Sequence, residues 1–119
     1  MKESIKTIIE WHEKTFPDAT LDGQLEKFVE EEGEYNENPN LLELADMYIV
    51  ACGIARFDSI LALKYFAKVR RKLNNRIWVR CGGNGVFQMV VEDKMKKNRN
   101  RVWGKSGDGV YHHQLGIED

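Results

Sequence analysis

The sequence contains little proline and little cysteine, and each shortage limits the kind of fold it can form. Its 119 residues include two prolines, Pro17 and Pro39, and both lie between segments with helical patterning. Because proline breaks helices, the segments on either side can be uninterrupted helices. The two cysteines, Cys52 and Cys81, have the spacing of neither a zinc motif nor a disulfide framework. The fold must therefore rest on a hydrophobic core.

The sequence also lacks a strong net charge and a long apolar run. A formal net charge of -1 gives no general attraction to nucleic acid or anionic lipid, so neither a nucleic-acid polymer nor a membrane is expected as a partner. The longest apolar run, Met47–Ala55, is far shorter than the roughly 20 residues of a membrane span. With no signal-peptide pattern, a cytoplasmic location is expected. The length predicts a single domain covering residues 1–119.

Apolar residues recur at helical spacing in successive segments, which predicts an all-α fold, a bundle of four to five helices. The residues expected to face the core include Leu21, Leu25, Phe28 and Val29 in the second segment, Ile60 and Leu63 in the fourth, and Met89 in the fifth. The third segment is apolar nearly all round and should be the central helix. Thr20 and Asp22 are both candidates for the N-cap of the second helix, and Asp58 is the expected N-cap of the fourth. A loop is expected at Cys81–Gly85, and an irregular tail without strand pairing after Trp103. The predicted helices are Glu3–Thr15, Leu21–Asn36, Leu41–Phe57, Asp58–Asn75 and Phe87–Arg101.

Two pairs of carboxylates stand at helical spacing on consecutive predicted helices. Glu31 and Glu34 lie near the end of the second helix, and Glu43 and Asp46 lie near the start of the third. The short connection Asn38–Asn40 predicts antiparallel packing, so the two pairs should face each other. Packed carboxylates repel and lose hydration, and a hard cation relieves both effects. This arrangement predicts a site for Mg²⁺, with Mn²⁺ as an alternative.

Each acidic motif also has a simpler reading. Glutamates such as those of Glu30–Glu37 usually form a solvated helix face. Glu43 is also explained by a helix cap that begins at Asn40. Asp46 is harder to explain in this way, because it lies one turn further into an apolar helix and needs a partner. The pairing of both motifs favours the functional interpretation.

A basic segment near the C-terminus offers groups that bind phosphate. Lys94, Asn98 and Arg101 fall on one helix face and could hold a polyphosphate beside the metal. The simpler reading is a solvated basic face. Trp103 could stack on a base, or it could pack in the core.

Together these motifs resemble the MazG-like, all-alpha NTP pyrophosphatase superfamily. Residues Glu30–Glu34 are similar to its Glu-Glu-x-x-Glu motif, and Glu43–Asp46 are similar to its Glu-x-x-Asp motif. Stretches similar to phage-type members are Trp11–Pro17, Glu43–Val50, Asn98–Trp103 and Asp108–His113.

The resemblance implies Mg²⁺-dependent hydrolysis of a nucleoside triphosphate to the monophosphate and pyrophosphate. It also implies a homodimer or a dimer of dimers. By motif position, the metal ligands would be Glu31, Glu34, Glu43 and Asp46. Glu30 would be a further ligand or a base that orients water, a role that Glu34 could share. The substrate would contact Lys94, Asn98, Arg101 and Trp103.

Two alternatives stay open at the level of sequence. A related helical fold hydrolyses phosphoribosyl-ATP, and a non-catalytic helical interaction module would also carry charged faces. Base recognition could involve Trp11, His12, Phe16, Trp103 or a histidine of the His112–His113 pair. The simpler reading of His12 is an ordinary residue at the edge of its helix. One departure from the family pattern is Glu32, which replaces a usually apolar residue and therefore needs a partner.

Overall fold

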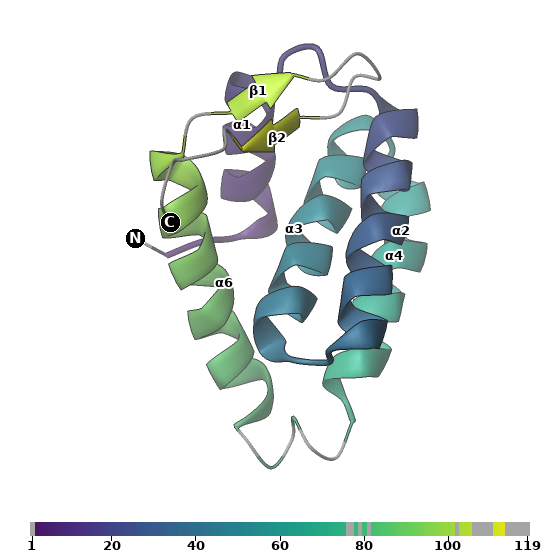
Figure 1. The fold of residues 1–119 in the computed structure, drawn as a ribbon, viewed down its shortest axis with the longest axis vertical. Coiled ribbons are helices and arrows are strands. Elements are labelled where there is room, and N and C mark those ends of the chain that lie inside the picture. The colour runs from purple at the N-terminus through teal and green to yellow at the C-terminus, as the bar shows by residue number, and fades with distance from the viewer. Residues whose placement is uncertain are drawn as a thin grey trace.

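The computed structural model describes residues 2–75, 78, 80, 82–101, 103–105 and 111–113, and the main body of the described structure is a helical bundle, as predicted (Figure 1). A short antiparallel strand pair follows the last helix. The elements are α1 (Ile5–Thr15), α2 (Leu21–Glu37), α3 (Leu41–Phe57), α4 (Ser59–Leu73), α6 (Gly83–Asn100), β1 (Trp103–Lys105) and β2 (Tyr111–His113).

Side-chain caps fix where four of the described helices begin, and Ser4 is the cap of α1. The predicted caps Thr20 and Asp58 are confirmed, and Asn40 caps α3 in the same way. Each side-chain oxygen accepts a hydrogen bond from a backbone N–H in the first turn, a group that has no partner inside the helix. The bonds run from the backbone nitrogens of Gly23, Glu43 and Leu61, at 3.0, 3.0 and 2.9 Å.

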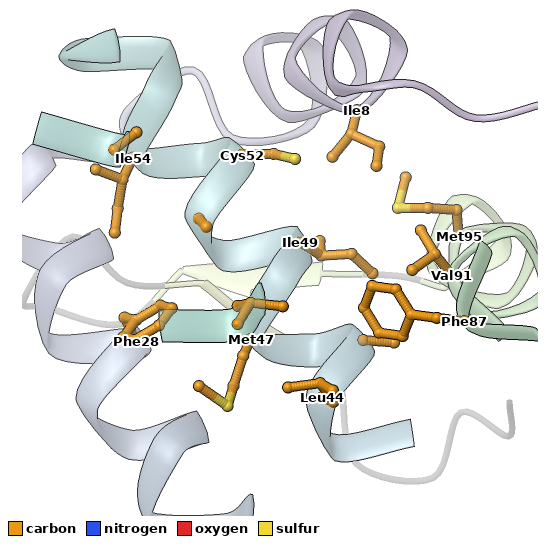
Figure 2. Close-up of a cluster of buried hydrophobic side chains, with 14 of the residues drawn as sticks. Ile8, Phe28, Leu44, Met47, Ile49, Cys52, Ile54, Phe87, Val91 and Met95 are labelled. Carbon is orange, nitrogen blue, oxygen red and sulfur yellow. The ribbon is translucent and has the colours of Figure 1, made fainter. Parts of the chain in front are cut away.

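Helix α3 is the centre of the bundle, as its nearly continuous apolar sequence predicts. It packs against α1, α2, α4 and α6. Its side chains Leu44 and Met47 are fully buried among residues from the surrounding helices, including Ile8 of α1, Phe28 of α2 and Val91 of α6 (Figure 2). Because a helix with neighbours on most sides must be apolar on most sides, α3 tolerates few polar residues.

The inward stripe of α2 differs from the predicted one. Val29, expected inside, is 68% exposed. The buried positions are instead Gly23, Gln24, Phe28, Glu31 and Tyr35. They recur at helical spacing and form a face of α2 that does not include Val29. Glu31 therefore lies on the same face as the core residue Phe28.

Three other apolar residues expected inside are exposed. Ile60 and Leu63 on α4 are 79% and 65% exposed, and Met89 on α6 is 69% exposed. The inner face of α4 is set by Ala62, Val69 and Leu73, which leaves Ile60 and Leu63 on the opposite side.

Within the described ranges, no helix combines the length and the apolar character needed to cross a membrane.

Two expectations about the C-terminal region were wrong. Helix α6 begins at Gly83 rather than near Phe87, directly after Gly82, which takes a left-handed conformation with φ of 111°. Glycine-rich composition thus marks a helix start here and not a longer loop. In the tail, β1 and β2 pair antiparallel with Trp103 opposite His113. Strands of three residues are too short to give a recognisable alternating pattern. Cys81 and residues 106–110 lie outside the described residues.

Candidate metal centre

Helices α2 and α3 bring three of the predicted carboxylates together. Glu31 comes from the buried face of α2, Glu43 from the first turn of α3, and Asp46 from the next turn. One carboxylate oxygen from each of these residues lies within 4.8 Å of the other two. The antiparallel packing of α2 and α3 creates this meeting point, because the end of one helix lies beside the start of the other (Figure 1).

Glu34 completes the predicted set of four. The negative charge of its carboxyl group helps to raise the pKa of Glu31, Glu43 and Asp46. Glu34 is the most open of the group, on the exposed side of α2. The four residues expected to bind metal are therefore neighbours in space.

Two oxygens of this cluster are buried without a hydrogen-bond partner among the described residues, Oε2 of Glu31 and Oε2 of Glu43. Burial raises the pKa of Glu31 to about 8, and the negative charge of Asp46 adds to the rise. Burial likewise raises the pKa of Glu43 and of Asp46. The carboxyl groups of the cluster are thus harder to ionise than ordinary ones, because the chain's own groups do not fully compensate their negative charge.

Two lysines partly neutralise the cluster. Lys27 Nζ lies 3.4 Å from Glu31 Oε1 and 3.6 Å from Glu30 Oε1. Lys94 Nζ lies 3.5 Å from Asp46 Oδ1, so Asp46 has the partner that its position required. Lys27 was missed from the sequence, although its position one turn before Glu31 on α2 was a signal for an ion pair.

Helix α6 turns its predicted phosphate-binding face towards this acidic cluster. Lys94 contacts Asp46 directly, and the positive charge of Arg101 also acts on Asp46. Arg101 Nη1 donates to Asn98 Oδ1 at 3.0 Å, and Asn98 is buried. Asn98 therefore positions Arg101, while Lys94 and Arg101 supply the positive charge beside the carboxylates.

The aromatic residues near Arg101 pack against one another. Trp103 Nε1 donates to the backbone oxygen of Asn98 at 3.1 Å, and its ring meets Trp11 and Phe16 edge-on, with centroids 6.2 and 5.1 Å away. Trp11 and Phe16 are buried. These contacts support the packing interpretation of Trp103, and a contact with a base stays a prediction.

His12 takes part in a buried polar network. Its Nδ1 accepts from Arg56 Nη1 at 3.1 Å, and its side chain also bonds to Gln24. Burial and the positive charge of Arg56 lower the pKa of His12 to about 4. The neutral imidazole of His12 therefore links α1, α2 and α3, and this role is structural.

The structure separates Glu30 and Glu32 from the carboxylate cluster. The side chain of Glu30 is 53% exposed and pairs with Lys27. Glu32 has the partners that its position required, since its carboxylate lies 3.7 Å from Lys68 Nζ and 3.6 Å from Lys72 Nζ. Among the acidic residues of α2, Glu34 is therefore better placed than Glu30 to act on a water near the cluster.

The donor set fits a hard divalent cation. The converging ligand atoms are all carboxylate oxygens, which Mg²⁺ and Mn²⁺ prefer, and two of them are buried with no partner in the described part of the chain. The exposed Glu34 leaves an open side through which water and phosphate oxygens could reach a bound ion. Comparison with protein-family models, curated proteins and solved structures finds no match to this chain.

Proposed function

We propose that this protein is a Mg²⁺-dependent nucleoside triphosphate pyrophosphohydrolase of the MazG-like type. The observation that carries the proposal is the convergence of Glu31, Glu43 and Asp46, with two buried oxygens that lack a partner in the described structure. The positive charge of Lys94 beside this cluster gives a triphosphate a second attachment point. The sequence resemblance supports the same class of reaction.

In the proposed site, Glu31, Glu34, Glu43 and Asp46 hold the metal. When bound, Mg²⁺ supplies charge neutralisation for the phosphate oxygens and lowers the pKa of a coordinated water. Each carboxylate must be ionised to act as a ligand, so the raised pKa of Glu31 means that binding displaces a proton.

The chain's own residues then organise the hydrolysis. Glu34 orients a water and accepts its proton as the water oxygen forms a bond to the α-phosphorus. The bond between the α-phosphorus and the bridging oxygen breaks, and pyrophosphate leaves with that oxygen. Lys94 and Arg101 stabilise the charge that develops on the leaving group. The products are the nucleoside monophosphate and pyrophosphate.

The resemblance extends the proposal to assembly and location. A homodimer or a dimer of dimers in the cytoplasm is the form expected for an enzyme of this type. Its role would be control of the nucleotide pool.

The test is pyrophosphate release from a panel of NTPs and dNTPs, with Mg²⁺ and with EDTA. We expect Mg²⁺-dependent release with a preference for some of the nucleotides. Glu34→Gln should lower the turnover by about 10²-fold or more, because it removes the proton acceptor. Glu26→Gln, at an exposed position on the same helix, is the matched control and should keep wild-type turnover.

Two outcomes would contradict the proposal. Folded wild-type protein that releases no pyrophosphate from any nucleotide would exclude this activity, and release from phosphoribosyl-ATP alone would assign the alternative substrate. Retention of full turnover in Glu34→Gln would exclude Glu34 from the mechanism.

A further inference from the structure

A second site is suggested by a cleft between the C-terminal halves of α2 and α4. Its volume is about 420 Å³, within the size range of small-molecule pockets. Glu32, the residue after Glu31 on α2, lines this cleft. Two adjacent residues of one helix therefore belong to different sites, Glu31 to the carboxylate cluster and Glu32 to the cleft. The lining residues are Glu32, Tyr35, Lys68, Arg71, Lys72 and Asn75.

The cleft carries an excess of positive charge. Lys68, Arg71 and Lys72 share one face of α4 and contribute three positive charges, against the single carboxylate of Glu32. Glu32 lies 3.7 and 3.6 Å from the two lysine Nζ atoms. Strong charge-assisted bonds are about 2.7–2.9 Å long, so these are loose pairs that another anion can replace.

Tyr35 adds an aromatic wall and a hydrogen-bond donor. Lys72 Nζ lies 5.1 Å from the centroid of the Tyr35 ring, so two of the lining residues are held against each other by a cation–π contact. The Tyr35 hydroxyl oxygen accepts from Trp78 Nε1 at 2.9 Å. Because Trp78 is the donor in that bond, the hydroxyl hydrogen stays available for an acceptor in the cleft.

From these features we infer that the cleft binds a small molecule bearing a diphosphate group. Two lysines, an arginine fork and a tyrosine hydroxyl match the several oxygens and the multiple charge of a diphosphate. When the ligand is absent, the Glu32 carboxylate pairs with Lys68 and Lys72. The site is separate from the carboxylate cluster, and the inference does not depend on the proposed hydrolysis.

The simpler reading is that these cations only complement the dipole at the end of α4. Basic residues in the last turn stabilise any helix, and α4 has Arg70, Arg71 and Lys72 there. In that reading Arg70 and Arg71 contribute equally to the stability of α4, and no ligand is required. The cleft interpretation distinguishes them, because Arg71 lines the cleft and Arg70 does not.

Calorimetric titration of the full chain with inorganic pyrophosphate, in EDTA and low salt, tests the inference. We expect saturable binding to the wild type. Arg71→Gln should weaken it by about tenfold, since it removes a charge-assisted contact. Arg70→Gln should leave it unchanged. Glu32→Gln should strengthen it, because the competing carboxylate is gone.

Four results would overturn the inference. They are an absence of binding to the wild type, equal losses in Arg70→Gln and Arg71→Gln, no gain in Glu32→Gln, and loss of binding in Lys94→Gln. The last result would place pyrophosphate at the carboxylate cluster instead. Both arginines are exposed, so neither variant should disturb folding, and circular dichroism checks this.

Discussion

Glu31 is the residue where the candidate metal centre and the core meet. The sequence shows its spacing from Glu34, which is why the ligand set could be predicted. It does not show that Glu31 shares a helix face with Phe28, because the apolar residues Leu25 and Val29 suggest a different inward stripe. The burial that makes Glu31 costly, and so points to a cation, became visible only when α2 was packed on α3.

Replacing Glu31 with glutamine should affect stability in opposite directions with and without metal. In EDTA, the variant should be more stable than wild type by about 1–3 kcal/mol, because a neutral amide avoids burying a carboxylate charge beside Asp46. Wild type should gain thermal stability on addition of Mg²⁺, and Glu31→Gln should lose this gain. Thermal melts in Mg²⁺ and in EDTA measure both effects.

Glu26→Gln is the control for this experiment, since Glu26 is exposed on the same helix. It should melt as wild type does in both buffers. A Glu31→Gln variant that keeps the full Mg²⁺-dependent gain would show that Glu31 is not a ligand.

Gly53 shows how closely the polar network around His12 is packed. A Cβ at this position would lie 2.5 Å from Gln24 Oε1 and 3.0 Å from His12 Nε2. Gly53→Ala should therefore destabilise the protein by about 1–3 kcal/mol in urea unfolding. Gly33→Ala is the matched control, because nothing lies within 4 Å of its Cβ.

Gly33→Ala should stabilise the fold by about 0.5–1 kcal/mol, because Gly33 is at an open helical position where alanine is favoured. Equal effects of the two substitutions would contradict the close packing at Gly53.

At the scale of the elements, prediction succeeded where a side chain marks the end of a helix. Helix α3 begins and ends at the predicted residues. Asn40 caps its start, and Asp58, which follows its last residue, is the N-cap of α4. It failed where no side chain gives a signal. Helix α6 has no side-chain cap, and its start at Gly83 depends on the backbone conformation of Gly82.

The contact of α1 with α3 predicts a pH dependence of stability. Arg56 Nη1 donates both to His12 Nδ1, at 3.1 Å, and to the backbone oxygen of Phe16, at 2.8 Å. Protonation of His12 would remove the acceptor and place two positive charges together. The folded-state pKa of about 4 lies below the ordinary value of 6.5, so the unfolded chain binds more protons between these values.

The contribution of His12 is therefore complete above pH 6.5 and is lost as the pH falls towards 4. Over that interval it amounts to on the order of 3 kcal/mol. The carboxylates with raised pKa have the opposite effect in the same range, so the measurement is the difference between wild type and His12→Gln in urea unfolding. That difference should shrink as the pH falls, and a constant difference would show that His12 does not titrate as described.

At the scale of the whole molecule, the sequence predicted the pairing of α2 with α3 but not the docking of α6. The short connection at Asn38–Asn40 leaves the first pair of helices little choice of arrangement. Placing Lys94 beside Asp46 depends on how α6 packs on α3 across a long separation in the chain, which helical spacing cannot show. The expectation that this basic face lies beside the metal therefore rested on its residue types and not on a predicted packing of α6.

The most direct test of the metal centre is binding of Mn²⁺, as a spectroscopic substitute for Mg²⁺, followed by electron paramagnetic resonance. The wild type should bind Mn²⁺, with Mg²⁺ competing. Asp46→Asn should weaken binding by more than about tenfold, whereas Asp93→Asn, on the exposed side of α6, should not change it. Absence of binding by folded wild type, or equal affinity in Asp46→Asn, would contradict the assignment of the carboxylate cluster as a metal centre.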